Sequence, residues 1–340
     1  MKAAPEISQK RQRFSNGRCV LFINDNISGN IIINKLVPEL IFLEFKPVIY
    51  LLKPRIPDKA KNHGLIDFSF YDSIIGKQVI FPFLNRFSSL LKGRKEGPGN
   101  NTTNNMCYTL EQLREAYDLE LYKTDDINNK KNYSSIAQDK EITGAISIRN
   151  LAIFKPETIR AFDNHAFFWN LHSGVLPQYR GAHPQFWSLL NGEKYCGLTL
   201  HEINAGIDTG KIINRSVYPI DFHKSYMRLF LEKSLKANCL ITQALKSHIH
   251  KNRIPAPLND NTKARYFSFP DDNDCKSFVN KGFSISNPVE MRDFYLSQYS
   301  VPDTRHEELL NNEIIQAIAQ WERSKETATK KAASGSRRSA

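Results

Sequence analysis

The sequence predicts an open, mostly parallel, Rossmann-like α/β sheet with helices on both faces, followed by a mainly helical C-terminal extension. Two short apolar runs, residues 18–24 (RCVLFIN) and 47–52 (PVIYLL), flank the apolar-periodic stretch 31–42. A strand, a helix and a second strand so close together form a unit whose strands pair in parallel. A further apolar run, residues 166–171, ends in polar side chains, as is typical where the carboxyl ends of strands meet in such sheets.

Proline is expected to interrupt two helices in the first third of the chain. The stretch 31–42 contains Pro38, and the stretch 68–91, whose aromatic and aliphatic spacing favours a helix, contains Pro82. Proline inside a helix removes a backbone donor and clashes with the preceding turn, so each helix should bend or break there. Residues 93–105 (GRKEGPGNNTTNN) have the composition of a flexible loop.

Thr109 and Gln112 have the spacing of a capping box, which predicts a helix from Leu110 to Tyr117. Apolar and alternating patterns bounded by turn residues predict the later strands. These strands span residues 119–122, 144–149, 195–203 and 211–218. The remaining helices of this part are expected at residues 157–162, 185–190 and 222–252. The last of them is long enough to pack across the sheet.

The chain changes character beyond about residue 260. Two short helices are expected to start near Asp271 and Asn287, where Asp or Pro marks a helix N-terminus, and a final amphipathic helix covers residues 305–324. We therefore divide the chain into a basic disordered tail, a globular domain, an extension and a second basic disordered tail. Their bounds are residues 1–17, 18–255, 256–324 and 325–340.

The positive charge of the chain is concentrated at its two ends. The net charge is +12, and residues 1–18 and 321–340 contribute +4 each. Such ends could anchor the protein on RNA or on an anionic membrane, or they could simply be solvated. Their Ser, Ala, Thr and Gly content favours the second interpretation, so a nucleic-acid partner is not expected.

Composition limits the other classes of partner. The five cysteines are scattered without a C-x-x-C pair, which indicates reduced thiols in a cytoplasmic protein and argues against a structural metal site. The first 14 residues carry charges but no apolar core, so they are not expected to be a secretory signal. No apolar run approaches the 18 residues of a membrane span.

Three motifs in order along the chain carry the chemistry. Asn170-x-His172 ends a strand, and both side chains point to the same side because they are two residues apart. The loop 176–181 (LPQYRG) follows, and Asp208-x-Gly210 comes next. In this order and spacing they resemble the formyltransferases that use 10-formyltetrahydrofolate. That family includes glycinamide ribonucleotide transformylase, methionyl-tRNA formyltransferase, and the amino-sugar and hydroxyornithine formyltransferases.

The resemblance implies that Asn170, His172 and Asp208 are catalytic and that residues 18–255 are the catalytic domain. Formyl transfer needs a donor for the developing oxyanion and a group that takes the proton of the amine. The Asn170 carboxamide suits the first task, while either His172 or Asp208 could be the base. His201 is expected to have a structural or supporting role. No metal ligand is expected.

The resemblance also implies which residues bind the co-substrate, 10-formyltetrahydrofolate, and the acceptor. The loop after the strand 144–149 and the loop before Asp208 should line the pteridine pocket. The residues assigned to that pocket are Leu151, Ile153, Phe154, Ile203, Ala205 and Ile207. For Leu151, Ile153 and Phe154, ordinary packing between strand and helix is an alternative. The residues assigned to the acceptor are Asn24, Asn30, Tyr179 and Arg180.

The expected function is transfer of a formyl group to a primary or hydroxylated amine of a small molecule, such as a hydroxyornithine-like amine or an amino-sugar nucleotide. Residues 266–270 (YFSFP) resemble the extension of small-molecule formyltransferases, and Gly174 stands where the tRNA enzymes have Ser. A methionyl-tRNA formyltransferase, a formyltetrahydrofolate hydrolase and a non-catalytic protein that uses its basic tails to bind RNA or membrane are the alternatives. A homodimer is left open.

Overall fold

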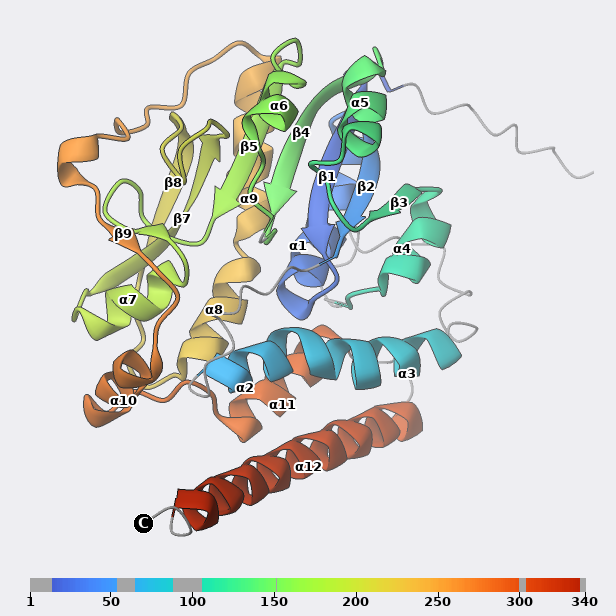
Figure 1. Ribbon diagram of the computed structural model, residues 1–340. Coiled ribbons are helices and arrows are strands. Elements are labelled where there is room, and N and C mark those ends of the chain that lie inside the picture. The colour runs from blue at the N-terminus through green and yellow to red at the C-terminus, as the bar shows by residue number, and fades with distance from the viewer. Residues whose placement is uncertain (1–13, 54–64, 88–105, 151, 300–303, 337–340) are drawn as a thin grey trace, which may run out of the picture.

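The computed structural model describes residues 14–53, 65–87, 106–150, 152–299 and 304–336. The expected loop at 93–105 and most of the N-terminal tail lie outside these ranges. Figure 1 shows one sheet at the centre, with helices packed on both of its faces and a long helix across one end.

The main sheet has seven strands in the order β3-β2-β1-β4-β5-β7-β8. These strands are β1 (Arg18–Asn24), β2 (Lys46–Leu52), β3 (Glu120–Thr124), β4 (Ile142–Ile148), β5 (Phe167–His172), β7 (Tyr195–Glu202) and β8 (Ile212–Pro219). The first five strands in this order pair in parallel. β7 pairs antiparallel with β5, and β8 pairs antiparallel with β7 at the edge of the sheet. The predicted fold class is therefore confirmed.

Successive side chains along each strand point to opposite faces of the sheet, so a core forms on each face. In β1, Leu21 belongs to the core under α1 (Ile27–Phe42), α4 (Leu110–Tyr117) and α9 (Ala237–Ile249). Phe22, the next residue, belongs to the core under α5 (Lys130–Gln138) and α6 (Pro156–Arg160). Because both faces are covered, the strands are buried on both sides, as in other parallel sheets.

Neither proline interrupts its helix as predicted. α1 continues through Pro38, since apolar side chains on both sides of it are buried against the sheet. Residues 66–86 form one helical path of four segments, with π-helical turns in its middle. These segments are α2 (Ile66–Ser69), η3 (Phe70–Ile74), η4 (Gly76–Ile80) and α3 (Phe81–Arg86). Pro82 lies in the first turn of α3, just after the second π-helical segment, and the path continues through it to Arg86.

The prediction of one long helix at 222–252 is wrong in one respect, because the structure has two helices there. α8 (Tyr226–Ser234) and α9 are separated at Leu235–Lys236. At the end of α8, Ser234 Oγ donates to the Phe230 carbonyl, a side-chain bond that competes with the regular helical ladder. The capping box of Thr109 and Gln112 and the helix that it starts are as predicted.

The C-terminal extension packs into the same core as helices of the domain at residues 18–255. Its helices are α10 (Asp272–Asn280), α11 (Pro288–Gln298) and α12 (Thr304–Ser336), and the first two start after the predicted residues Asp271 and Asn287. Residues of all three share a core with the path 66–86, α7 (Pro184–Leu190) and α8. A second, two-stranded sheet pairs β6 (Arg180–Gly181) with β9 (Tyr266–Phe267).

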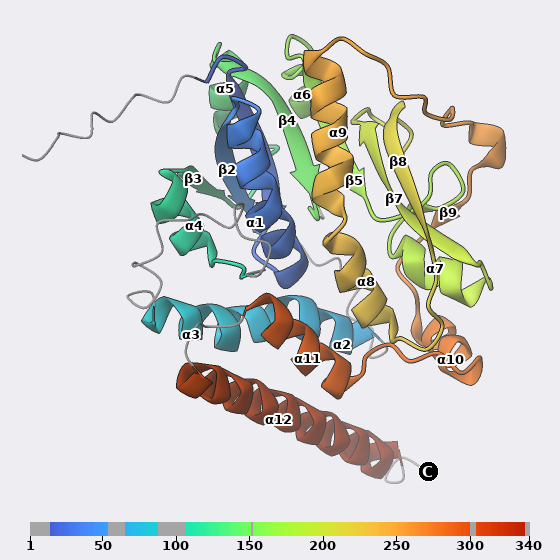
Figure 2. The same ribbon diagram turned by 180° about the vertical axis from the view of Figure 1, so that it is seen from behind.

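α12 is longer than predicted, since residues 325–336, expected in the basic tail, continue the helix. Figures 1 and 2 show it lying beside α2, α3 and α11 at the end of the molecule. Asp67 on α2 accepts hydrogen bonds from Trp321 Nε1 and Lys325 Nζ, both at 2.9 Å. The Trp321 ring stacks on Phe70 at 4.5 Å, so this helix is fixed to the helical path at 66–86.

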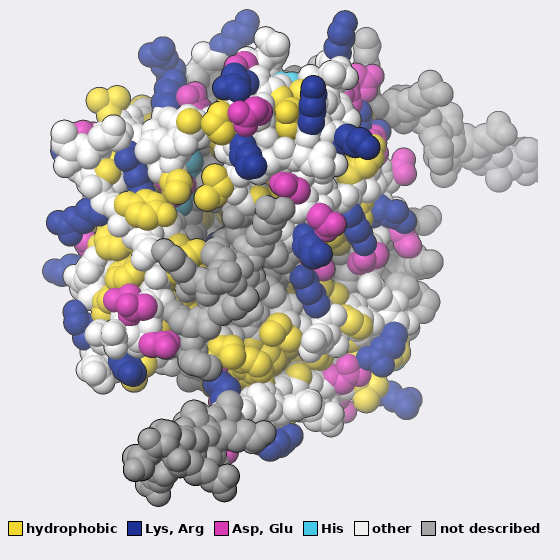
Figure 3. Space-filling model, in the orientation of Figure 1, with side chains coloured by type: hydrophobic (Ala, Val, Ile, Leu, Met, Phe, Trp, Pro, Cys, Tyr) yellow, Lys and Arg dark blue, Asp and Glu magenta, His cyan; other side chains and the backbone are white. Residues whose placement is uncertain are grey.

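Lys and Arg side chains are interspersed with Asp and Glu over the face shown in Figure 3. Within the part of the chain that the structure describes, no helix is long and apolar enough to cross a membrane.

We predict that Trp321→Ala lowers the free energy of unfolding by about 2–3 kcal/mol, because it removes a stacked, partly buried ring. Trp321→Phe keeps the stack and loses only the bond to Asp67, so it should cost about 1 kcal/mol. Urea denaturation of the two variants measures both values. Equal stability of both variants and the wild type would show that α12 is not docked in solution.

Candidate active site

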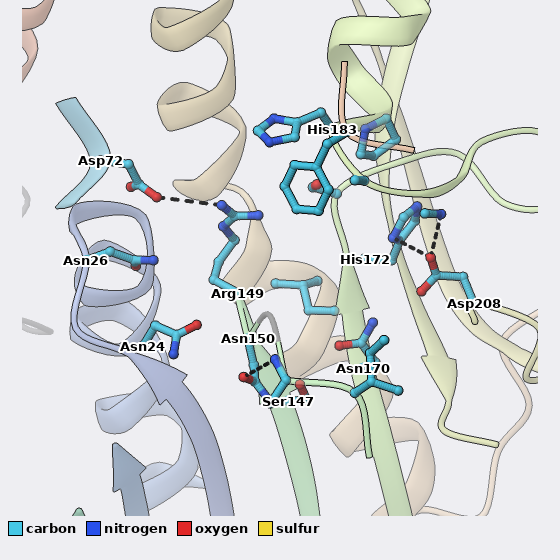
Figure 4. A pocket seen from close by; sticks show the side chains of 18 of the residues that line it. Asn24, Asn26, Asp72, Ser147, Arg149, Asn150, Asn170, His172, His183 and Asp208 are labelled. Carbon is cyan, nitrogen blue, oxygen red and sulfur yellow. Dashed lines mark hydrogen bonds and ion pairs between the residues drawn. The ribbon is translucent and has the colours of Figure 1, made fainter. Parts of the chain in front are cut away.

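A cavity of about 620 Å³ lies at the carboxyl ends of β1, β4 and β5. The strand order reverses between β1 and β4, and open α/β sheets bind ligands in the crevice at such a point. Figure 4 shows Asn170, His172 and Asp208 on one side of this cavity. Asp72 lies on the opposite side, and Arg149 projects between the two.

The three residues of the predicted triad meet at one place. Asn170 and His172 end β5, and Asp208 lies in the loop between β7 and β8. His172 Nδ1 is 3.4 Å from Asp208 Oδ2. His201 on β7 joins the group, because its Nε2 is 3.3 Å from Asp208 Oδ1 and 3.1 Å from Asn170 Nδ2. The carboxylate is therefore held between two imidazoles.

The Asp208 loop is fixed by neighbours that are far away in the sequence. Asp208 has a left-handed backbone, with φ of 53°, which turns its side chain back toward β5. The Gly181 N–H donates to Asp208 Oδ2 at 2.8 Å. Asn259 Nδ2 donates to the carbonyl oxygens of Asp208 and Gly210, at 2.9 and 2.7 Å. The C-terminal extension thus helps to place the carboxylate.

The hydrogen bonds determine where the protons lie. His172 Nε2 is 2.7 Å from the Tyr179 carbonyl oxygen, and His201 Nδ1 is 2.8 Å from the Glu202 carbonyl oxygen. A carbonyl oxygen only accepts, so both nitrogens carry hydrogen, and each ring turns its other nitrogen to Asp208. A lone pair that faces a carboxylate is repelled, so a proton on a ring nitrogen that faces Asp208 would stabilise the group.

His201 Nε2 accepts the hydrogen bond of Asn170 Nδ2, because an amide nitrogen only donates, so a proton on the Asp208 side would be carried by His172. Burial lowers the pKa of His172 and so favours the neutral ring, while the Asp208 charge opposes this shift. Burial alone would raise the pKa of Asp208, but the two histidines and the Gly181 N–H outweigh it and hold this pKa far below its usual range. Asp208 is thus ionised at neutral pH.

The turn after β5 leaves no room for a larger residue at position 174. A Cβ on Gly174 would lie 2.5 Å from Pro184 Cβ and 2.7 Å from His172 Nε2. Lys233 on α8 donates to the Ser173 carbonyl oxygen at 2.7 Å, and burial lowers the pKa of this lysine to about 8. The close packing at Gly174 and the hydrogen bond of Lys233 together hold the turn against the ring of His172.

Most residues assigned to the pteridine pocket line the cavity. Ile203, Ala205 and Ile207 do so from the loop that leads to Asp208. Ile153 and Phe154 do so from the loop after β4, where Phe154 is also part of the core. Leu151 lies outside the described residues. The roles of these residues as folate ligands remain predictions.

Of the residues assigned to the acceptor, only Asn24 lines the cavity. Asn30 is buried and bonded to Asn34 and Tyr299. The Tyr179 hydroxyl donates to Glu193, and the Arg180 guanidinium donates to side chains of the extension. The assignment of Asn30, Tyr179 and Arg180 is therefore corrected, because tertiary packing uses their polar groups elsewhere.

Several residues of the cavity were not assigned a role from the sequence. They come from segments far apart in the chain and are Asp72, Arg149, His183, Tyr226 and Phe230. His201 lies directly opposite Asn170 in the antiparallel pair of β5 and β7. Because this register is set by tertiary structure, the sequence offered only the fact that a histidine occurs in that strand.

Residues 145–239 match the family model of the formyl transferases. This segment contains all three motifs, so the resemblance to the formyl transferases is confirmed for this segment. The methionyl-tRNA formyltransferase of Chlorobium chlorochromatii is 27% identical over 46% of this chain and 48% of its own length. That of Dehalococcoides mccartyi is 34% identical over 29% of this chain and 31% of its own length. The chain thus spans about half the length, or less, of these curated relatives.

Two solved structures are similar to the chain. The N-formyltransferase from Helicobacter canadensis, in complex with folinic acid and dTDP-3-aminofucose, has a TM-score of 0.45 and 18% identity, and the match covers 74% of this chain and 70% of the other. Glycinamide ribonucleotide transformylase 1 from Symbiobacterium toebii has a TM-score of 0.47 and 14% identity, and covers 75% and 96%.

His183 should make the stability of the protein sensitive to acid. Its Nδ1 lies 2.7 Å from the Tyr226 hydroxyl, and burial, with a smaller effect of Arg149, lowers the pKa of His183 from 6.5 to about 3. Between pH 6.5 and about pH 3, His183 binds a proton in the unfolded chain but not in the folded protein. Folding therefore loses up to about 1.4 kcal/mol for each pH unit below 6.5.

We predict that His183→Asn reduces this loss, measured as the free energy of unfolding in urea between pH 7 and 5. Asn tolerates the left-handed φ of 48° at this position and does not titrate. Parallel pH curves for the variant and the wild type would contradict the assignment.

Proposed function

We propose that this protein is an enzyme that moves a formyl group from 10-formyltetrahydrofolate to an amine of a small molecule. The observation that carries the proposal is the meeting of Asn170, His172 and Asp208 at one end of a cavity large enough for ligands. The family match of the segment that holds all three motifs supports it.

The cavity fits a pteridine on its Phe154 and Ile203 side. Apolar side chains there lie next to backbone groups of the loops after β4 and β7, the combination that a flat, polar-edged ring requires. When bound, 10-formyltetrahydrofolate supplies an electrophilic formyl carbon. We assign the pteridine slot to Ile153, Phe154, Ile203, Ala205 and Ile207, in agreement with the sequence prediction.

The polar residues have separable tasks. Asn170 Nδ2 donates one hydrogen to His201, which leaves its second hydrogen for the formyl oxygen. A donor placed in this way contributes about 3 kcal/mol to the rate, because the negative charge develops on that oxygen in the transition state. His172 exchanges a proton with the reacting groups, and Asp208 stabilises the charged form of the ring.

The acceptor is a small amine in this proposal, either hydroxyornithine-like or an amino-sugar nucleotide. The C-terminal extension favours it, because Tyr266 and Phe269 line the cavity and so leave a limited space beside the triad. The curated relatives are methionyl-tRNA formyltransferases, which makes methionyl-tRNA the second candidate acceptor. A cytoplasmic location belongs to the same proposal, since all five cysteines are free thiols and four of them are buried.

The test is formyl transfer with purified protein, 10-formyltetrahydrofolate and each class of acceptor, followed by mass spectrometry of the product. Product with a small amine supports the proposal, and product only with methionyl-tRNA selects the second candidate. Consumption of the folate without any acceptor would instead identify a hydrolase. No consumption under any condition would favour a binding protein.

We predict that His172→Ala abolishes transfer but weakens binding of 5-formyltetrahydrofolate by less than tenfold, or about 1.4 kcal/mol. A flat pteridine is recognised mostly through backbone amides and carbonyls, so the ring of His172 should contribute little to its binding. Calorimetry with the wild type and the variant measures the affinity. Exposed His223 provides the control, and His223→Ala should change neither quantity. Complete loss of folate binding in His172→Ala would make His172 a binding or structural residue.

We predict that His201 positions Asn170 rather than reacting itself. His201→Phe removes the acceptor that orients the carboxamide and should lower kcat about 10–100-fold, with the KM for folate unchanged. His201→Gln retains an acceptor oxygen of similar reach and should lose less than about tenfold. Equal losses in the two variants, or a loss confined to KM, would rule out this role.

A further inference from the structure

Arg149 is a charged residue in the cavity that the proposed formyl transfer does not use. It follows directly after β4, and its side chain is 17% exposed. Its Nε donates to Ser28 Oγ at 3.1 Å, and its guanidinium carbon lies 4.3 Å from the centre of the Phe230 ring. Figure 4 shows the guanidinium turned toward Asp72 and away from Asp208. The side chain is therefore held rigidly between α1 and α8.

The backbone at Arg149 is strained in the same way as at Asp208. Among the described residues, six non-glycine residues have a positive φ, and three of these line the cavity. They are Arg149 (52°), His183 (48°) and Asp208 (53°). Such a conformation costs on the order of 1–3 kcal/mol and persists where the surroundings impose it, commonly at ligand sites. At Asp208 it aims a functional side chain, and it does the same for Arg149.

Asp72 lies beside the guanidinium of Arg149 and balances its charge. Asp72 is 3% exposed and accepts bonds from Ser28 N and Ser28 Oγ, at 2.9 and 3.1 Å. The nearest nitrogen of Arg149 is 3.6 Å away, which is longer than a well-formed hydrogen bond. The carboxylate thus lowers the cost of burying the guanidinium, while the planar fork can still bind an anionic group of a ligand.

The register of the sheet places this group beside the reacting centre. Ile148 pairs with Leu171, so the next residues, Arg149 and His172, leave neighbouring strands at the same level. Adjacent strands are about 4.8 Å apart. One small molecule could therefore place its amine at the triad and an anionic group at Arg149. The surrounding rings of Phe68, Tyr226 and Phe230 exclude water and strengthen such a contact.

We propose that Arg149 binds a carboxylate or phosphate group of the acceptor, and that Asp72, Ser28 and Phe230 hold it in place for this task. This inference rests on the proposed function in taking the ligand to be the acceptor. It restricts that acceptor to amines with an anionic group close to the nitrogen that receives the formyl group. Neutral amines and amines without such a group are then poor substrates.

The experiment measures anion binding without turnover, so that its result is independent of formyl transfer. Inorganic phosphate, pyrophosphate and acetate are titrated by calorimetry into the wild type, into Arg149→Met and into the double variant Arg149→Met/Asp72→Asn. Methionine keeps an unbranched side chain of similar width but lacks the charged guanidinium. The double variant also removes the buried carboxylate that the single variant leaves without its counter-charge, and it keeps the test valid if Arg149→Met does not fold. Each titration is repeated with saturating 5-formyltetrahydrofolate.

We expect at least one anion to bind the wild type and to bind both variants at least tenfold more weakly. Tighter binding of phosphate or pyrophosphate would indicate a phosphate-bearing acceptor, and tighter binding of acetate a carboxylate-bearing one. Binding of 5-formyltetrahydrofolate should change less than threefold in the variants. The proposal is overturned if no anion binds the wild type, or if the variants bind it equally well. Displacement of the anion by 5-formyltetrahydrofolate would overturn it too, because Arg149 would then bind the folate.

Discussion

The ionised Asp208 carboxylate between His172 and His201 is the interaction on which the arrangement of this site depends. Each of its oxygens faces one imidazole nitrogen, and each imidazole is fixed by a backbone carbonyl oxygen on its other side. This leaves one orientation for each ring. The orientation of His201 then determines that of the Asn170 carboxamide. A negative charge so deeply buried is tolerated only because these partners and the Gly181 N–H stabilise it.

The surroundings of that carboxylate explain why the C-terminal extension is part of the site. Asn259 binds the backbone of the Asp208 loop. Arg180, in the loop of the second motif, is bonded to Asn259 and Asn261. The β6–β9 pair adds backbone bonds between the same two regions. The extension also shares a core with the helical path at 66–86. The boundary at residue 255 therefore separates segments of sequence that fold as one body.

Conformational strain and buried charge gather around the cavity and are scarce in the sheet below it. Arg149, His183 and Asp208 have left-handed backbones, while Asp72 and Lys233 are charged groups with little exposure. Each would be unfavourable alone, and each is stabilised by a specific contact with another segment of the chain. Such features accumulate at sites whose geometry serves a ligand rather than stability.

The sequence by itself determined the alternation that buries both faces of the sheet, the capping residues Thr109, Asp271 and Asn287, and the spacing of the three motifs. These are local properties, because side-chain direction and capping depend on residues a few positions apart. Two predictions from local patterns were wrong. The helix continues through Pro38 because its apolar side chains pack against the sheet, and the helix at 222–252 breaks near Ser234, whose side chain bonds to the backbone.

Only the tertiary structure decided which polar residues face the cavity. His201 meets Asn170 through the register of two antiparallel strands, and Arg149 meets Asp72 across 77 positions of sequence. Tyr179 and Arg180 belong to the second motif, yet their polar groups bind other parts of the chain and do not face the cavity. The physical reason is that contacts between distant segments follow from how the elements pack, and no local pattern records which partner a buried polar group will find.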